Sequence, residues 1–370
     1  MERFGFGHAS GDDWQAATQA CAAQLDAPAG ANLGFVYVTD ALANDLGKIT
    51  ERLIQDTGVP DWVGTTGVGI CATGHEYFDE PAVAAMVGCF PDDAFGVFDR
   101  FDDDSARFLS RLGPWAARGE GYFAVIHADP RDPEMMQRVP ELAEAAGCFL
   151  VGGLASSRGD YAHVAGTLTE GTLSGVMFSA EVPVVTALTQ GCSPIGPVRE
   201  VTQCQDNIAI EIDGRPALDV FKDDIGEVLA QDLQRTAGYI FAAFPVAGSD
   251  RADYMVRNLV GLDVERGLLA IGAPLEDGQR ILFCRRDGQT ARDDLARMLG
   301  DLKRRAPSPI KGAVYFTCLG RGPNMFGTQS AELGAIQDEL GDVPLVGFFC
   351  NGEISHDRLY SYTGVLSLFL

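Results

Sequence analysis

Four apolar segments of this chain start at a glycine and end on small or polar residues. They start at Gly34, Gly121, Gly238 and Gly312, and they read GFVYVTD, GYFAVIHADP, GYIFAAFP and GAVYFTCLGRG. A strand with one face in solvent alternates apolar and polar residues, whereas a strand covered on both faces is apolar almost throughout. The pattern therefore predicts strands at the centre of covered sheets.

The segments at Gly34, Gly121 and Gly312 are followed by the same order of elements. A stretch able to form a helix comes first, then a strand that opens on Val-Gly, and then a further apolar strand. The Val-Gly strands read VGTTGVGI, VGGLASS and VGFFCNGEIS, and the strands after them read AAMVGCF, LSGVMFS and YTGVLSLFL. The recurring order predicts a duplicated unit, because each copy has an apolar face that only a neighbouring copy can cover. Chance similarity among apolar strands is the alternative.

These elements predict an α/β protein. We expect two similar halves built from duplicated strand-helix-strand units, with mixed sheets at the centre and helices outside; two sheets stacked face to face would supply the cover. We also expect a helix from Asp12 to Leu25, a solvated loop from Pro91 to Asp104 and a hairpin turning at Asp213-Gly214. A domain boundary is expected between residues 1–220 and 221–370.

Composition narrows the class of partner. The chain has 370 residues, and its 52 acidic side chains against 28 basic ones give a formal net charge of −24. Such a field repels phosphate backbones and anionic lipid, so we expect neither nucleic acid nor a membrane as a partner. The charge is typical of a solvated surface, and an acidic docking surface is the alternative. No apolar run reaches the ~20 residues of a membrane span and no signal peptide is visible, so we expect a cytoplasmic protein.

Catalytic and metal-binding signatures are absent from the sequence. There is no P-loop, no G-x-G-x-x-G after a strand, no H-E-x-x-H and no G-x-S-x-G. The nine cysteines include no C-x-x-C pair, which favours free thiols over disulfides or a structural zinc site. The five histidines never have ligand spacing, although a single histidine could still ligate a haem iron. We therefore expect a colourless, metal-free protein.

Three loops carry polar groups that could contact a ligand. The loop from Gly191 to Gly196 offers the Cys192 thiol, with a purely structural turn as the alternative. The loop from Cys318 to Gly327 holds Arg321 between two glycines at the end of a buried strand, where ligands of α/β sheets gather.

The third loop, from Gly347 to Ile354, places Glu353 among apolar residues. A carboxylate there must turn to solvent, find a cation or keep its proton.

Longer stretches of the chain resemble the FIST family. They are TQGCSPIGPVREVTQCQDNIAIEIDGRPALDV, YMVRNLVGLDVERGLLAIGAPLEDGQRILFCRRD, FTCLGRGPNMFG and PLVGFFCNGEI followed by YTGVLSLF. The resemblance covers an N-terminal domain, from about Leu33 to Val220, and a C-terminal domain, from about Phe221 to Tyr360. It implies a sensory module that binds a small ligand, with amino acids as the proposed class. Some members of the family are haem-based nitric-oxide sensors. Because the sequence contains no kinase, receiver, cyclase or F-box segment, the resemblance implies a separate output partner such as a histidine kinase.

We therefore predict a non-catalytic sensor of an amino acid or related metabolite. An α-amino acid needs a fixed cation, a fixed anion and a neutral amide, which Arg321, Glu353 and Asn351 would supply. The other predicted site residues are Arg257, Cys318 and Cys192. An ion pair between Arg321 and Glu353 is the competing structural interpretation. A haem-based nitric-oxide sensor and an enzyme with Cys192, Cys318 or Cys350 as nucleophile are the alternative functions.

Overall fold

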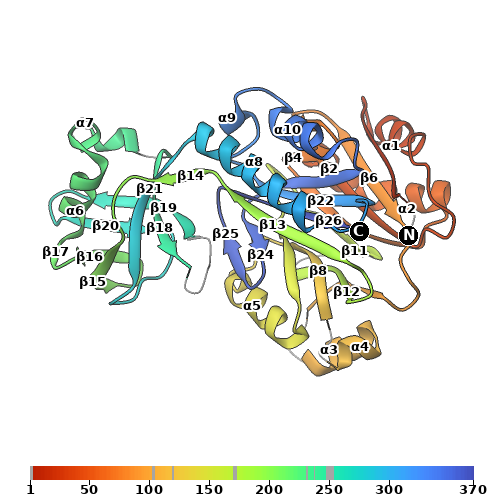
Figure 1. Ribbon diagram of the computed structural model, residues 1–370, viewed down its shortest axis with the longest axis horizontal. Helices are drawn as coiled ribbons and strands as arrows, with labels where there is room; N and C mark the ends of the chain where they lie inside the picture. Colours follow the sequence, from red (N-terminus) through yellow and green to blue (C-terminus); the bar gives the residue numbers. More distant parts are fainter. Residues whose placement is uncertain are drawn as a thin grey trace. The chain divides into compact units, whose positions relative to one another are not determined.

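The computed structural model describes residues 3–101, 105–118, 121–169, 173–230, 232–236, 238–246 and 254–370. The chain forms two compact units (Figure 1). Unit 1 consists of Met1–Gln190 and Arg292–Leu370, and unit 2 of Gly191–Ala291.

Unit 1 contains three copies of one order of elements, here called repeats 1, 2 and 3. Each repeat has a strand, a helix, a strand, a helix, a strand, a two-stranded hairpin and a closing strand. Repeat 1 comprises β1 (Gly5–Ser10), α1 (Trp14–Ala22), β2 (Leu33–Thr39), η1 (Asp40–Asp45), α2 (Leu46–Thr57), β3 (Asp61–Gly67), β4 (Gly69–Ala72), β5 (His75–Phe78) and β6 (Ala82–Gly88). Repeat 2 comprises β7 (Phe95–Phe98), α3 (Ser105–Leu112), α4 (Pro114–Ala117), β8 (Gly121–Ala128), α5 (Met135–Ala146), β9 (Phe149–Leu154), β10 (His163–Ala165), β11 (Thr167–Thr169) and β12 (Leu173–Ser179). Repeat 3 comprises β13 (Val184–Gln190), α8 (Gly288–Arg305), β22 (Gly312–Cys318), α9 (Pro323–Phe326), α10 (Ala331–Leu340), β23 (Leu345–Cys350), β24 (Glu353–Ser355), β25 (Arg358–Tyr360) and β26 (Thr363–Phe369), with unit 2 inserted in the chain after β13.

The repeats exchange their hairpins. The described strands of unit 1 form three six-stranded sheets, in the orders β1-β6-β2-β3-β10-β11, β7-β12-β8-β9-β24-β25 and β13-β26-β22-β23-β4-β5. Each sheet therefore takes four strands from one repeat and the hairpin from another. Only the pairs β2–β3, β8–β9 and β22–β23 are parallel, so all three sheets are mixed. The strands at Gly34, Gly121 and Gly312 occupy equivalent places, which confirms the duplicated unit.

The glycine of each Val-Gly pair has a common structural role. A side chain at Gly64, Gly152 or Gly347 would place its Cβ 1.7–1.9 Å from a carbonyl oxygen of the neighbouring parallel strand. These glycines lie opposite Val36, Ile126 and Tyr315, respectively. Only glycine permits this close backbone approach. The Val-Gly dipeptide therefore recurs because the parallel strands pair in the same register in all three sheets.

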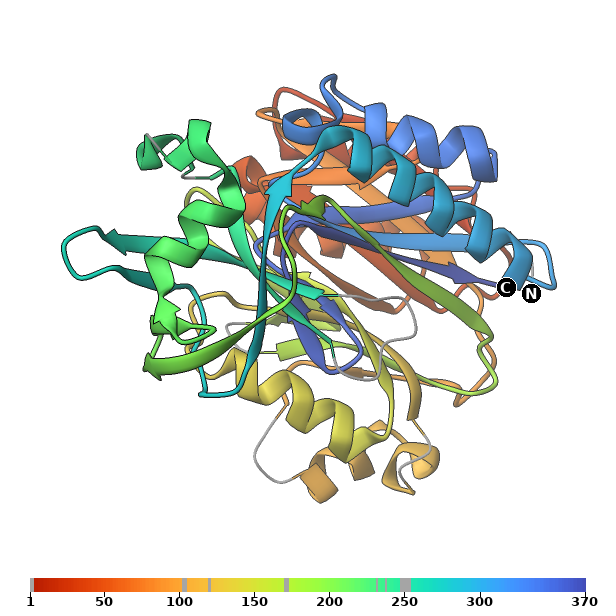
Figure 2. The ribbon, with the colours of Figure 1, turned by 60° about the vertical axis from the view of Figure 1, so that its left-hand side comes forward.

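The three sheets share one core. The residues that follow those partners, Tyr37, His127 and Phe316, meet there with ring centroids 5.5, 6.2 and 6.4 Å apart. Apolar side chains of α1 and α2 cover the other face of the β2 sheet, and those of α3 and α5 cover the β8 sheet. Figures 1 and 2 show α8 and α10 beside the β22 sheet. The predicted cover on both sides of the apolar strands is thus confirmed.

Unit 2 is built differently. Its elements are β14 (Cys192–Pro194), β15 (Arg199–Gln205), β16 (Ile208–Ile212), β17 (Arg215–Pro216), α6 (Ala217–Ile225), α7 (Glu227–Ala230), η2 (Leu233–Thr236), β18 (Ile240–Pro245), β19 (Tyr254–Asp263), β20 (Leu268–Ile271) and β21 (Arg280–Arg286). Six of its described strands pair antiparallel in the order β21-β15-β16-β20-β19-β18, and β18 pairs with β21 again. Closing the sheet removes exposed strand edges, and the enclosed side chains form a separate core.

Some of the secondary-structure elements expected from the sequence are present in the structure, and one expected loop contains a strand instead. The structure confirms the α/β class. The helix expected from Asp12 to Leu25 is present as the shorter α1, and Asp13 accepts a capping bond from the backbone N–H of Ala16. The hairpin also turns at Asp213-Gly214, as expected. The loop predicted from Pro91 contains β7, which pairs with β12, and its residues 102–104 lie outside the described part.

The two compact units do not follow the boundary expected after residue 220. Unit 1 takes residues from both predicted domains, because β13 pairs with β26, the last strand of the chain. The boundary stays a prediction about sequence domains. No helix in the described ranges is long and apolar enough to cross a membrane.

Candidate functional site

Arg321 lies in the loop that follows the carboxyl end of β22, and its side chain is fully buried. Its Nε donates to Glu332 Oε1 at 2.8 Å, and Nη2 lies 2.7 Å from the same oxygen. The guanidinium stands over the ring of Phe326, 5.2 Å from its centroid. Burial lowers the pKa of Arg321, but the charge and hydrogen bond of Glu332, together with Tyr315 and Cys318, outweigh burial and raise the pKa above its ordinary value. Nη1 has no hydrogen-bond partner among the described residues.

Glu332 sits in the first turn of α10 and is also fully buried. Besides Arg321, its carboxylate accepts from the Tyr315 hydroxyl at 2.6 Å and from the Gly322 backbone N–H at 3.1 Å. A buried carboxylate is tolerated only with such compensation. The ion-pair partner of Arg321 is therefore Glu332, and the alternative in which Arg321 pairs with Glu353 is wrong.

Glu353 begins β24 and is fully buried. Its Oε2 accepts from the backbone N–H and the hydroxyl of Thr363, at 3.1 and 2.8 Å, while Oε1 has no partner among the described residues. Burial raises the pKa of Glu353 to about 8, although the bonds from Thr363, the charge of Arg321 and a weaker hydrogen bond with the Cys318 thiol act in the other direction. The carboxyl group thus binds or loses a proton near neutral pH.

Glu76 enters the same region from the hairpin of repeat 1. Its Oε1 accepts from the backbone N–H groups of Glu332 and Leu333, at 3.2 and 3.3 Å, and so caps the N-terminus of α10. Its Oε2 is buried and has no partner among the described residues. Burial and then the charge of Glu332 raise the pKa of Glu76 to about 7.

Together Glu76, Arg321, Glu332 and Glu353 form what we call the buried charge cluster. Sequence reasoning identified Arg321 and Glu353 from their loops but missed the other two. Glu332 lies on a helix of ordinary composition, and Glu76 reaches it across 256 residues of chain. The one local signal was Glu76 itself, a carboxylate inside an aromatic strand, HEYF.

The structure distributes the other predicted site residues differently. Cys318 is buried at the end of β22, and burial and then the charge of Glu353 raise its pKa. Asn351 is exposed, and its Nδ2 donates to the carbonyl oxygen of Ala155 at 3.2 Å. Arg257 and Cys192 belong to unit 2.

In unit 2, Arg257 Nη1 donates to the carbonyl oxygen of Val256 at 2.9 Å. Cys192 is buried, and its carbonyl oxygen accepts from the hydroxyl of Tyr254. Neither residue belongs to the buried charge cluster.

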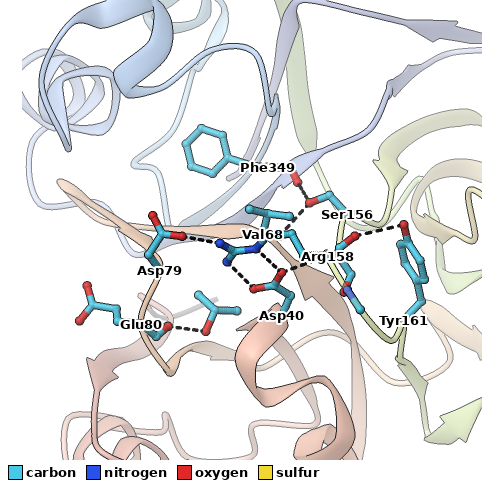
Figure 3. Close-up of polar contacts among 11 residues, drawn as sticks. Asp40, Val68, Asp79, Glu80, Ser156, Arg158, Tyr161 and Phe349 are labelled. Atoms are coloured by element: carbon cyan, nitrogen blue, oxygen red, sulfur yellow. Dashed lines mark hydrogen bonds and ion pairs between the residues drawn. The ribbon is translucent and has the colours of Figure 1, made fainter.

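Apart from the buried charge cluster, a second set of polar contacts joins the three repeats at the carboxyl ends of their strands (Figure 3). Ser156 of repeat 2 accepts from the backbone N–H of Val68 in repeat 1 at 2.9 Å and donates to the carbonyl oxygen of Phe349 in repeat 3. Beside it, Arg158 binds both oxygens of Asp40 at 2.8 Å and also contacts Asp79. These contacts hold the ends of the repeats together.

Two of the described histidines are buried inside unit 1. His127 and His163 are buried, with one ring nitrogen bonded to Tyr37 and Thr65, respectively. Burial lowers the pKa of His127 to about 3 and that of His163 to about 4, so both are neutral. The described cavities of about 540, 430 and 350 Å³ have no histidine in their walls. No group of three or more His, Cys, Asp or Glu among the described residues could hold a metal ion.

Comparison with known proteins gives two family models that match this chain. The FIST N domain matches residues 32–215, and the FIST C domain matches residues 217–356, which is consistent with two halves. An uncharacterised protein of Mycobacterium tuberculosis is 30% identical in an alignment of 325 positions that covers 83% of each protein. An uncharacterised protein of Mycobacterium bovis is 29% identical in an alignment of 383 positions, gaps included, that covers 97% of this chain and 96% of the relative.

Proposed function

This chain belongs to the FIST family, and we propose that it binds an amino acid or a related small metabolite without catalysing a reaction. FIST domains are small-ligand-binding signalling domains. The ligand would act inside the cell, in the cytoplasm, and its binding would be passed to a separate signalling protein such as a histidine kinase.

We assign the ligand to the buried charge cluster. The carrying observation is a pair of unsatisfied groups of opposite charge, Arg321 Nη1 and Glu353 Oε1, both fully buried. A buried polar group without a partner is costly, and native proteins rarely leave one unsatisfied. The carboxylate of an α-amino acid would accept from Nη1, and its ammonium group would donate to Oε1.

The loop after β22 would admit the ligand. It contains Gly320, Gly322 and Gly327, the last two with φ values of 53° and 92°, which glycine adopts without strain. Since every charged group of the cluster is closed to solvent, ligand entry requires this loop to move. Closure would then exclude water and strengthen each charge-assisted hydrogen bond.

Two of the three candidate nucleophiles, Cys318 and Cys350, favour a binding protein over a thiol-dependent enzyme. A thiol nucleophile needs a lowered pKa, whereas burial raises the pKa of both Cys318 and Cys350. For the haem alternative, a Soret band in the purified protein remains the direct test.

A thermal-shift screen against the proteinogenic amino acids tests the proposal. A ligand at ~100 times its dissociation constant stabilises the folded state by ~2.7 kcal/mol. We expect at least one amino acid to raise the melting temperature of the wild type. Glu353→Gln should abolish this shift while leaving the Arg321–Glu332 ion pair in place.

Arg158→Gln is the matched control, because Arg158 lies outside the cluster and this substitution should leave the ligand shift unchanged. If no amino acid shifts the wild-type protein, or if Glu353→Gln responds like the wild type, the proposal is wrong.

A further inference from the structure

The buried charge cluster contains more negative than positive groups. Arg321 neutralises Glu332, but neither Glu76 nor Glu353 has an ion-pair partner within the described ranges. A neutral zwitterion adds no net charge and would leave this imbalance as it is. A ligand with a net positive charge would reduce it, and charge balance has a large weight where water is excluded.

The unpartnered atoms match three charged groups on one ligand. They are a donor, Arg321 Nη1, and two acceptors, Glu353 Oε1 and Glu76 Oε2. A carboxylate, an α-ammonium group and a cation at the end of a side chain would satisfy one atom each. Resting on the function proposed above, we infer that the ligand is a basic amino acid whose side-chain cation is bound by Glu76.

Gly322 lets Glu76 come close to the loop after β22 that carries Arg321. A Cβ at Gly322 would lie 3.4 Å from Glu76 Oε2 and 2.8 Å from the ring of Phe349. The absence of a side chain therefore lets Oε2 stand directly against the residue that follows Arg321. Phe349 and Phe326, which stacks on Arg321, supply apolar surface for the aliphatic part of the ligand.

The orientation of Glu76 is fixed before the ligand arrives. Its Oε1 is held by two backbone N–H groups of α10, and its own backbone N–H donates to Ser330 Oγ at 2.9 Å. The side-chain amide of Gln329 also donates to the carbonyl oxygen of Glu76, at 3.0 Å. Only Oε2 is left for a ligand, and a preorganised acceptor loses little conformational entropy on binding.

Binding of a cation should displace protons. With pKa values raised to about 7 and about 8, Glu76 and Glu353 hold protons in part of the population at neutral pH. A ligand cation favours the ionised carboxylates, so protons leave as it binds. The ionisable groups that act on these two carboxyls, or are acted on by them, are Cys71, Cys318, Arg321, Glu332 and Cys350.

Matched ligands test the inference on the wild-type protein. Isothermal titration calorimetry at pH 7 should compare L-lysine with L-norleucine, and L-arginine with L-citrulline, which differ chiefly in side-chain charge. We expect the charged member of at least one pair to bind at least tenfold more tightly. Its measured enthalpy should depend on the ionisation enthalpy of the buffer, which reports proton release.

Glu76→Gln keeps an oxygen for the α10 amides but removes the negative charge. It should reduce the preference for the charged member to less than threefold, without weakening the neutral member. Equal affinities of both members of both pairs in the wild type would overturn the basic-ligand inference and leave the proposed function standing. If neither these nor any other amino acid binds, the proposed function itself fails.

Discussion

Two arginine–carboxylate pairs lie at the carboxyl ends of strands, and their surroundings differ: the Arg158–Asp40 pair joins repeats 1 and 2, whereas the Arg321–Glu332 pair lies within repeat 3. The side chains of Arg321 and Glu332 are both 0% exposed, whereas in the other pair Arg158 is 56% exposed and Asp40 is 6% exposed. Because the Arg158 guanidinium is reached by water and salt, the attraction within this pair is screened, and screened pairs contribute little to stability. The buried pair compensates charges that water cannot reach, so each partner is indispensable to the other. The same kind of ion pair is thus a small contribution between repeats 1 and 2, here called the exposed latch, and a structural requirement within repeat 3.

Arg321→Ala should have the largest effect. It leaves Glu332 as an uncompensated buried charge, so we expect the free energy of unfolding to fall by about 3–5 kcal/mol. Urea denaturation followed by circular dichroism measures this. Combining Arg321→Met with Glu332→Gln should recover part of the loss, since Gln still accepts from Tyr315. A loss below about 1 kcal/mol for Arg321→Ala would mean that the two pairs are alike.

Substitutions at equivalent glycines of different repeats should lower the free energy of unfolding by similar amounts. Gly64→Ala and Gly347→Ala each push a Cβ to 1.7 Å from a carbonyl oxygen. Overpacking of this kind costs about 1–3 kcal/mol or more, and we expect similar losses in urea denaturation for both. Gly334→Ala is the control, because nothing lies within 4 Å of its Cβ and it is on α10. A loss at only one of the two sites would contradict their equivalence.

The buried cluster should make stability depend on pH in a way that the exposed latch does not. Burial raises the pKa of Glu353 from 4.5 to about 8, so the folded state binds this proton more tightly than the unfolded state. The resulting stability is fully present below pH 4.5 and is lost as pH rises to about 8, at no more than ~1.4 kcal/mol per pH unit.

Urea denaturation at pH 5, 6, 7 and 8 measures this slope. Glu353→Gln should flatten it, while Glu51→Gln, at an exposed position on α2, should leave it unchanged. A slope that Glu353→Gln does not alter would show that Glu353 titrates as it does in the unfolded chain.

Arg158→Ala should have the smallest effect. The exposed latch is expected to contribute about 0.2–1 kcal/mol to the free energy of unfolding, and less at high salt. The measurement is urea denaturation of the wild type and of Arg158→Ala, at low salt and at 1 M sodium chloride. A fall of more than about 2 kcal/mol in the free energy of unfolding would indicate that the Arg158–Asp40 pair is needed to hold the repeats together. It would weaken the contrast with Arg321.

Much of the scaffold could be predicted from the sequence because its signals are local. Apolar runs, the Val-Gly strands and the order of elements identified the repeated unit, and each Val-Gly glycine proved to be required by close strand contact. The hairpin exchange was not predictable from such signals. Thr73, between β4 and β5, bonds to Val343 across 270 residues, and nothing within the hairpin specifies that partner. The edge strand β7 was missed because its four residues lie within a polar, glycine-containing segment.

The candidate site divides in the same way. A glycine-flanked Arg321 and an apolar-flanked Glu353 are visible in their own loops, so sequence alone determined that these charges would need partners. Only the tertiary structure decided that Glu332 pairs with Arg321, that Glu76 caps α10, and that Arg257 and Cys192 belong to another unit. Local sequence sets which groups must be compensated, whereas burial and proximity, which set the cost of a charge, arise when distant segments pack together.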